Sequence, residues 1–188
     1  MTGIVILAAG SSSRLGQPKQ NLVYGGATLL QRIIKTALAT TCRPVIVVLG
    51  GNANLIKPTI EDLPVTIVYN EEWRDGMASS IKAGIAQQHG ADSVILTLCD
   101  QPFIVPDLLT QLIPENTFDT IAACSYNDTV GTPAFFGGKY FPELLKLKGS
   151  EGAKSLLMRY KEQIHVVPFP LGSVDIDTSD DFERLNGI

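Results

Sequence analysis

Residues 45–49, Val-Ile-Val-Val-Leu, form an unbroken apolar run rich in β-branched side chains. β-Branched residues favour strands. A strand that lacks alternating polar residues must be buried on both faces, as in a parallel sheet whose two faces are covered by helices. The run therefore predicts an internal strand of an α/β protein, ended by the glycines at positions 50 and 51.

Strands and helices alternate along the first 113 residues. Apolar residues at helical spacing predict helices, and short apolar runs predict strands. The first helix begins with a capping box, because Gln31 lies three residues after Thr28. The alternation predicts a three-layer α/β/α sandwich with a mostly parallel, Rossmann-like sheet. The predicted strands are 4–7, 44–49, 65–69 and 93–98, and the predicted helices are 29–38, 54–60, 76–88 and 106–113.

The pattern is less regular after residue 113. Asn127-Asp128 predicts a turn, and Thr178 with Asp181 predicts the start of a last helix. We find no repeat, linker or low-complexity segment, so we expect one domain over residues 1–188. A domain of this length buries roughly 70% of the surface of its unfolded chain. The further strand candidates are 120–124, 132–136, 164–167 and 173–176, with short helices at 140–147 and 153–160.

Composition argues against several classes of partner. The net charge is −4, whereas a nucleic-acid binder needs a basic face. No stretch approaches the roughly 18 apolar residues of a membrane span, so we expect a cytoplasmic protein with neither nucleic acid nor membrane as a partner. Cys42, Cys99 and Cys124 are odd in number and lack C-x-x-C spacing. They are interpreted as buried thiols.

A loop rich in small residues follows the first predicted strand. Its side chains leave the backbone open to a ligand, and consecutive backbone amides form a concave anion site. Arg14 and Lys19 add two cations. We therefore expect a triphosphate cradle, although an ordinary strand-to-helix connection would have a similar composition. The candidate nucleotide-binding residues here are Leu7, Ala8, Ala9, Gly10, Ser11, Arg14 and Lys19, with Arg14 and Lys19 as the catalytic cations.

Two better-known phosphate loops do not fit. A P-loop has four residues between its glycines followed by Lys-Ser/Thr, but Gly10 and Gly16 enclose five residues, and Gln17-Pro18 precedes Lys19. The dinucleotide fingerprint needs an acidic residue at the end of the second strand, where this chain has Leu49-Gly50-Gly51-Asn52.

Residues 7–19 match Leu-Ala-Ala-Gly-x-Ser-x-Arg-x-Gly-x-Pro-Lys throughout, and this pattern resembles the opening motif of the MobA-like nucleotidyltransferases. The form with Ala8-Ala9-Gly10 is similar to the molybdenum cofactor cytidylyltransferases, and Pro18-Lys19-Gln20 also resembles the cytidylyltransferase of isoprenoid synthesis. The resemblance implies a transfer of CMP from CTP to a phosphorylated acceptor, molybdopterin above all, and a molybdoenzyme as a possible client. It also implies magnesium.

Two acidic segments are candidates for the metal. Asp100 directly follows a predicted strand, and carboxylates at that edge of an α/β sheet can hold Mg²⁺ together with substrate phosphates. Asp175 and Asp177 would face one side of a strand, where a shared cation would relieve their repulsion. The family's Asp after this strand matches Asp100, and its Asp-Ile-Asp-Thr ending resembles residues 175–178. We expect Asp100 and Asp175 as ligands, with Asp177 as the second choice; a capping role is the alternative for Asp100 and Asp177.

Residues 70–80, Asn-Glu-Glu-Trp-Arg-Asp-Gly-Met-Ala-Ser-Ser, resemble a further family segment. Asn70, Ser79 and Ser80 are expected to bind the base or ribose, whereas Trp73 is expected to pack. Residues 131–134 resemble a stretch near the acceptor. Ser150 stands where the family pattern usually has Asp, which leaves the acceptor open. The alternatives are a transferase that uses GTP or acts on a sugar or methylerythritol phosphate, and a non-catalytic molybdenum cofactor carrier.

Overall fold

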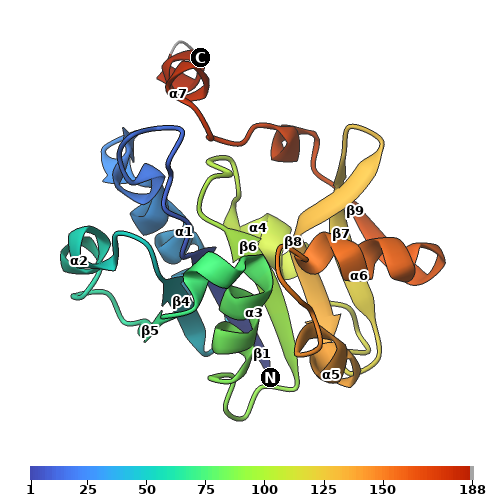
Figure 1. Ribbon diagram of the computed structural model, residues 1–188. Coiled ribbons are helices and arrows are strands. Elements are labelled where there is room, and N and C mark those ends of the chain that lie inside the picture. Colours follow the sequence, from blue (N-terminus) through green and yellow to red (C-terminus); the bar gives the residue numbers. More distant parts are fainter. Residues whose placement is uncertain (187–188) are drawn as a thin grey trace.

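The computed structural model describes residues 1–186. Its centre is a seven-stranded sheet of order β5-β4-β1-β6-β8-β7-β9 (Figure 1). Within this sheet, over residues 1–186, β8 alone runs antiparallel to the other strands. The strands are β1 (Thr2–Ala8), β4 (Val45–Leu49), β5 (Thr66–Tyr69), β6 (Ser93–Leu98), β7 (Ile121–Tyr126), β8 (Thr129–Gly137) and β9 (Ile164–Pro168), and β2 (Val23–Tyr24) with β3 (Ala27–Thr28) forms a separate hairpin.

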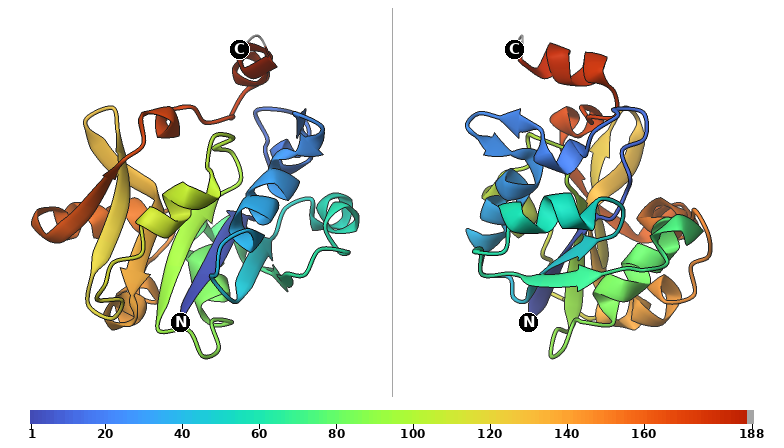
Figure 2. Two further views of the ribbon diagram at one scale, coloured as in Figure 1. Left: turned by 180° about the vertical axis from the view of Figure 1, so that it is seen from behind. Right: turned by 60° about the vertical axis from the view of Figure 1, so that its left-hand side comes forward.

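Helices cover both faces of the sheet, as the two turned views in Figure 2 show. One face packs against α1 and α4, and the other against α3, α5 and α6. The predicted three-layer sandwich with a mostly parallel sheet is thus confirmed, and so is the capping box between Thr28 and Gln31. The helices are α1 (Leu29–Leu38), α2 (Ala53–Ile56), α3 (Met77–Ile85), α4 (Pro106–Gln111), α5 (Phe141–Leu144), α6 (Ala153–Arg159) and α7 (Ser179–Asn186).

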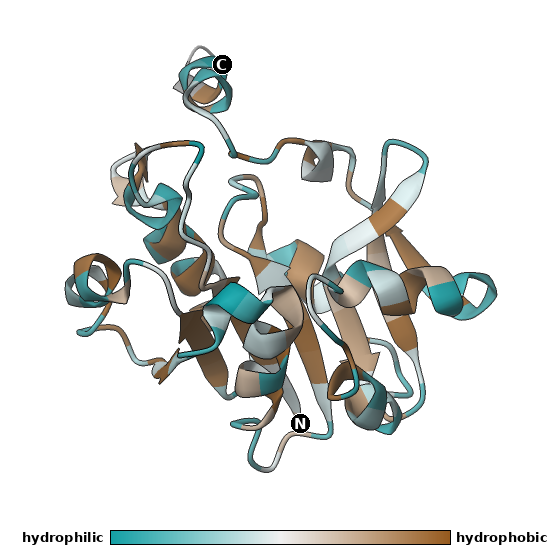
Figure 3. Ribbon diagram, viewed as in Figure 1, coloured by the Kyte–Doolittle hydropathy of each residue, from teal (hydrophilic) through white to brown (hydrophobic). Residues whose placement is uncertain are grey.

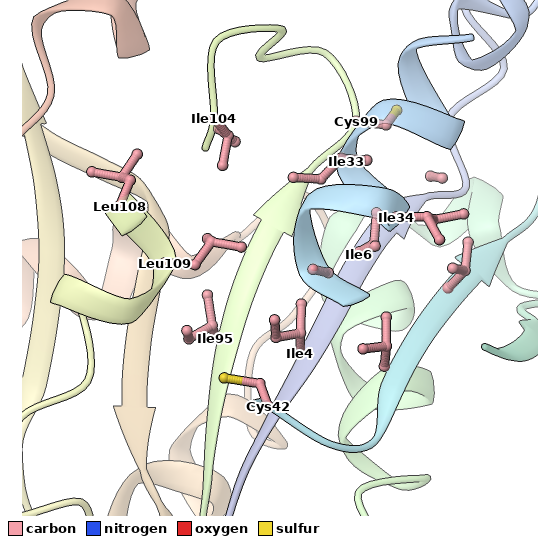
Figure 4. Close-up of a cluster of buried hydrophobic side chains, with 14 of the residues drawn as sticks. Ile4, Ile6, Ile33, Ile34, Cys42, Ile95, Cys99, Ile104, Leu108 and Leu109 are labelled. Carbon is pink, nitrogen blue, oxygen red and sulfur yellow. The ribbon is translucent and has the colours of Figure 1, made fainter. Parts of the chain in front are cut away.

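The core follows from the apolar strands. All five side chains of β4 are buried, and Ile4 and Ile6 of β1 are fully buried against Ile33 and Ile34 of α1 (Figure 4). Burying each such side chain contributes roughly 1.5–3 kcal/mol. Apolar residues dominate the central strands in Figure 3, whereas α7 is mostly hydrophilic. Within residues 1–186, no helix is both long and apolar enough to cross a bilayer.

The order of the strands places a topological switch point between β1 and β6. From β1 the chain moves through α1 to β4 and β5, and then returns to β6 on the opposite side of β1. The connections after β1 and β6 therefore diverge, and ligands of open α/β sheets bind at such a switch point, beyond the carboxyl ends of the strands. This edge is uppermost in Figure 1.

The prediction of a strand at residues 173–176 is wrong. Residues 170–173 form a 3-10 turn, and residues 174–178 belong to no helix or strand. Pro168 and Pro170 cannot donate to a sheet ladder, and the amide of Ile176 donates instead to the carbonyl of Asp100 (3.0 Å). The segment therefore crosses the edge of the sheet, and Asp175 and Asp177 do not share a strand face.

The last helix is attached to the loop after β1. The predicted start at Thr178 is confirmed: the backbone amide of Thr178 donates to Asp181 (2.8 Å), and the amide of Asp181 donates to the Thr178 hydroxyl (3.2 Å). Leu185 of α7 and Ile176 are buried in a small apolar cluster with Leu15. This cluster is separate from the two main cores and holds α7 above the sheet edge (Figure 1).

Candidate active site

A pocket of about 220 Å³ lies at the carboxyl ends of β1 and β6; we call it the loop pocket. It brings together the three segments that the sequence placed at this edge: the loop after β1, the start of α3 and Asp100. A Cβ atom added to Gly10 would meet no atom within 4 Å, so the backbone there is open to a ligand. The lining residues are Leu7, Ala8, Ala9, Gly10, Lys19, Gln20, Trp73, Gly76, Met77, Ser80, Leu98, Cys99 and Asp100.

Gln20 fixes the shape of the loop. Its side chain is 1% exposed, and its Nε2 donates to the carbonyls of Ala8 (2.9 Å) and Gly10 (3.0 Å). Its Oε1 accepts from the Ser12 hydroxyl (3.3 Å), which in turn accepts from the Lys19 amide (3.0 Å). One amide side chain therefore joins both limbs of the loop. Gln20 is not among the site residues expected from the sequence, although it belongs to the Pro18-Lys19-Gln20 segment that carries a resemblance to a cytidylyltransferase.

Lys19 lies between two carboxylates. Its Nζ donates to Asp100 Oδ2 (2.6 Å) and to Asp177 Oδ1 (2.8 Å), which come from distant parts of the sequence. Burial by itself lowers the pKa of Lys19, but the charge and hydrogen bond of Asp100 and the hydrogen bond of Asp177 outweigh this and raise it. The hydrogen bond from Lys19 holds the pKa of Asp177 below its usual range. Lys19 is therefore a fixed positive charge at the pocket wall.

Arg14 lies farther out. Its side chain is 73% exposed, and its Nη1 is 3.4 Å from Asp177 Oδ2. Neither Arg14 nor Ser11 lines the loop pocket. Positive φ angles occur at Ser12 and Gly16 rather than at Gly10. The tight bends of the loop therefore lie after Gly10, where the backbone is open. The Arg14 guanidinium lies at the outer, solvent-exposed side of the loop.

Asp100 is the common wall of two pockets. Its Oδ2 bonds to Lys19, but its Oδ1 is buried and has no hydrogen-bond partner among residues 1–186. A buried carboxylate oxygen without a partner is costly and suits a metal or phosphate-bound cation. A second cavity of about 170 Å³, the hairpin pocket, lies on the other side of Asp100. It is lined by Leu98, Asp100, Gln101, Tyr126, Asn127, Thr129, Thr132, Gly172, Ser173 and Asp175.

Asp175 faces the hairpin pocket rather than the loop pocket. Burial raises its pKa, and the charges of Asp100 and Asp177 raise it further. Within residues 1–186, no group of three or more His, Cys, Asp or Glu side chains is arranged to hold a metal. One or two carboxylates, such as those of Asp100 and Asp175, are enough for a divalent ion whose remaining ligands are substrate phosphates and water.

Asn70 bonds to both Ser79 and Ser80. The Asn70 Nδ2 donates to Ser79 Oγ (2.8 Å) and Ser80 Oγ (2.9 Å), and its Oδ1 accepts from the amide of Glu72 (3.0 Å). Ser80 lines the loop pocket, whereas Asn70 and Ser79 do not. The structure thus places Asn70 behind the pocket, where it orients the start of α3. Trp73 lines the pocket and stacks on the guanidinium of Arg74 (4.4 Å).

The residues around Ser150 support the start of α3. Gly76 has φ 106°, and a Cβ there would lie 2.3 Å from the carbonyl oxygen of Gly149. That carbonyl accepts from the amide of Ala78 (3.2 Å). Glu151 accepts from the amide of Lys148 (2.7 Å) within the same loop. The loop that carries the unusual Ser150 therefore closes over the helix start.

The wall of the hairpin pocket depends on Gln101 and Tyr126. Gln101 is 5% exposed; its Nε2 donates to the carbonyl of Gly172 (2.9 Å), and its Oε1 accepts from the Thr132 hydroxyl (3.3 Å). The Tyr126 hydroxyl donates to the carbonyl of Thr132 (3.3 Å), and burial raises its pKa. Of the family stretch near the acceptor, Thr132 lines this pocket. Gln101 and Tyr126 carry no motif that would have identified them.

Comparison with known proteins identifies the family. The sequence model of the MobA-like NTP transferase domain matches residues 4–164. Nicotine blue oxidoreductase of Paenarthrobacter nicotinovorans is 36% identical over 124 residues, which cover 65% of this chain and 61% of that protein. The molybdenum cofactor cytidylyltransferase of Escherichia coli K12 is 28% identical over 182 residues, covering 95% of this chain and 92% of the relative.

A solved structure agrees over the whole fold. Rv0371c from Mycobacterium tuberculosis is 32% identical with a TM-score of 0.88, covering 100% of this chain and 97% of that one. The same protein in complex with manganese aligns with a TM-score of 0.81 at 30% identity, covering 98% and 96% of the two chains. The chain belongs to the MobA-like NTP transferase family and is a nucleotidyltransferase.

Proposed function

We propose that this nucleotidyltransferase transfers CMP from CTP to the phosphate of molybdenum-bearing molybdopterin and releases diphosphate. The observation that carries the proposal is the shared wall: Asp100 and Leu98 line both the loop pocket and the hairpin pocket. A triphosphate in the first pocket and an acceptor in the second would meet at one carboxylate. Two reactants held on either side of a fixed group gain greatly in effective concentration.

The nucleotide and the acceptor are proposed from two similarities. Ala8-Ala9-Gly10 has the form that resembles the cytidylyltransferases. The E. coli relative named molybdenum cofactor cytidylyltransferase spans nearly all of this chain. The three described cysteines are free and buried, which suits a reducing compartment such as the cytoplasm.

In the proposed reaction, an oxygen of the acceptor phosphate forms a bond to the α-phosphorus of CTP. The bond from that phosphorus to the bridging oxygen breaks, and diphosphate leaves with the electron pair. The loop amides around Ala8 to Ser11 and the charge of Lys19 would stabilise the negative charge that builds on the leaving group. Arg14 would fold over the outer phosphates, and Ser80 would contact the nucleoside.

Asp100 and Asp175 would hold a divalent ion, magnesium in our proposal, with Asp177 next to them. When bound, such an ion neutralises phosphate charge and aligns the reacting groups. The unpartnered Oδ1 of Asp100 is the atom best suited to it. Lys19 would then exchange its bond with Asp100 for a bond to the triphosphate.

The test is diphosphate release. The protein is incubated with magnesium, one of the four nucleoside triphosphates and molybdenum-loaded molybdopterin, and the products are identified by mass spectrometry. We expect CTP alone to be consumed, with a cytosine dinucleotide formed. Consumption of GTP, or turnover only with a sugar or methylerythritol phosphate, would show that the proposed substrates are wrong. Tight binding of nucleotide or molybdopterin without diphosphate release would favour a molybdenum cofactor carrier. Because one relative is named an oxidoreductase, the product has to be identified directly.

A further inference from the structure

We propose that a third pocket, outside the active site, binds a ligand through its phosphate group. This α1 pocket has a volume of about 300 Å³ and lies between α1, the β2–β3 hairpin and the segment after Asp100. That volume is sufficient for a small oxyanion such as phosphate or diphosphate. Its lining residues are Gly25, Ala27, Leu29, Arg32, Ile33, Lys35, Thr36, Gln101, Pro102 and Ile104.

The charge of this pocket is wholly positive. Arg32 and Lys35 lie three residues apart on α1, so their side chains are neighbours on the helix surface. No Asp or Glu is among the lining residues. Within residues 1–186, no carboxylate lies within 4.0 Å of either cation. An anion would remove the repulsion between them.

Arg32 is held in place without being neutralised. Its Nη1 donates to the Tyr24 carbonyl at 3.4 Å and its Nη2 to the Pro102 carbonyl at 3.3 Å, both long for hydrogen bonds. Its Nε is buried and has no hydrogen-bond partner in the described part of the chain. The guanidinium also lies over the ring of Tyr24 (4.9 Å to the centroid). Of its five N–H donors, two are weakly used, which leaves capacity for the bidentate bonds that arginine forms with phosphate.

The rest of the pocket suits the same ligand. The Thr36 hydroxyl makes only a long bond of 3.4 Å to the carbonyl of Ile104, and Lys35 is exposed, so it can reach inward. Gln101 lines both this pocket and the hairpin pocket. A phosphate group on Arg32 would therefore steady residues 101–104, which directly follow Asp100. The ligand can be a free anion, including the diphosphate that the transferase reaction releases, or a phosphate carried by a nucleotide.

Hydrogen exchange read by mass spectrometry tests the proposal in the intact protein. Inorganic phosphate, diphosphate and CTP are titrated separately. We expect at least one of them to slow hydrogen exchange in residues 24–36 and 101–105. These segments can be measured separately from the loop after β1. Comparison of the three ligands identifies the source of the phosphate. Protection of residues 8–20 alone, or of none of these segments, would overturn the proposal.

Charge reversal provides the matched variants. Lys35→Glu is expected to lower the affinity for the protecting ligand about tenfold. Lys57→Glu, the same change at an exposed position outside all three pockets, is expected to leave this affinity unchanged. Because Lys35 is exposed, its replacement leaves the fold intact. Arg32→Gln should also abolish the protection. Equal affinity in Lys35→Glu and Lys57→Glu would refute the assignment. The measurement needs no turnover, so its result is independent of the proposed transferase substrates.

Discussion

The loop pocket and the hairpin pocket lie on either side of Asp100 but are built differently. The loop pocket is formed by small residues whose backbone is open, and Lys19 supplies a cation to it. The hairpin pocket is lined by polar side chains and Asp175, with no Lys or Arg among its residues. In our proposal, the loop pocket holds the triphosphate of CTP and the hairpin pocket holds the acceptor. Under that proposal, the difference teaches that nucleotide binding and acceptor choice depend on separate parts of the chain, the loop after β1 and the β7–β8 side of Asp100.

The largest test of this division is Lys19→Ala. Removal of one group that stabilises transition-state charge lowers kcat by about 10²- to 10³-fold. We expect this loss in a steady-state diphosphate assay, with the KM of the acceptor unchanged. Lys57→Ala, at an exposed lysine away from both pockets, is the control. A large change in the acceptor KM would mean that the two pockets do not act separately.

Gln20→Leu tests whether the shape of the loop matters as well as its charge. The substitution leaves the carbonyls of Ala8 and Gly10 without their donor, and each such loss costs about 1–3 kcal/mol. We expect kcat/KM for the nucleotide to fall by about tenfold to a hundredfold. Gln111→Leu, at an exposed position of α4, should have no effect. Wild-type kinetics in Gln20→Leu would remove Gln20 from the site.

Two glycine substitutions separate the pockets most directly. Gly10→Ala places a methyl group in open space above the loop, so we expect the nucleotide KM to rise about fivefold. Gly172→Ala would place Cβ 2.5 Å from the ring of Tyr126, so that the wall of the hairpin pocket shifts and the acceptor KM rises by a similar factor. Each variant serves as the control for the other. If both changed the same KM, the division would fail.

The smallest effect concerns the attachment of the C-terminal segment. Because the pKa of Asp177 is lowered in the folded state by the hydrogen bond from Lys19, ionised Asp177 stabilises the fold above its usual pKa of 3.8, and the contribution disappears as pH falls through the lowered value. Asp177 is partly exposed, so the pair contributes only about 0.5 kcal/mol. We expect Asp177→Asn to lower Tm slightly at pH 7 and not at all near pH 2. If the Tm difference between Asp177→Asn and the unchanged protein were the same at pH 7 and near pH 2, the ion pair would be excluded as the cause of that difference.

The sequence predicted those parts of the site that depend on local patterns. The small residues after β1 and the carboxylate directly after β6 were recognisable because each follows an apolar run that ends at the same edge of the sheet. The ion pairs of Lys19 were not predictable, since Asp177 reaches it across the sheet edge through a segment that is not a strand. The roles of Gln20 and Gln101 depend on which carbonyls tertiary packing brings near them.

The apolar cluster of Leu15, Ile176 and Leu185 has a practical consequence for handling the protein. Because α7 packs against Leu15 of the loop after β1, a fluorescent fusion or a surface tether attached after α7 would transmit force to this loop. Attachment at the exposed residues 61–62, on the β5 side of the sheet, would spare it. Sensors or immobilised forms of the enzyme are therefore best attached at residues 61–62.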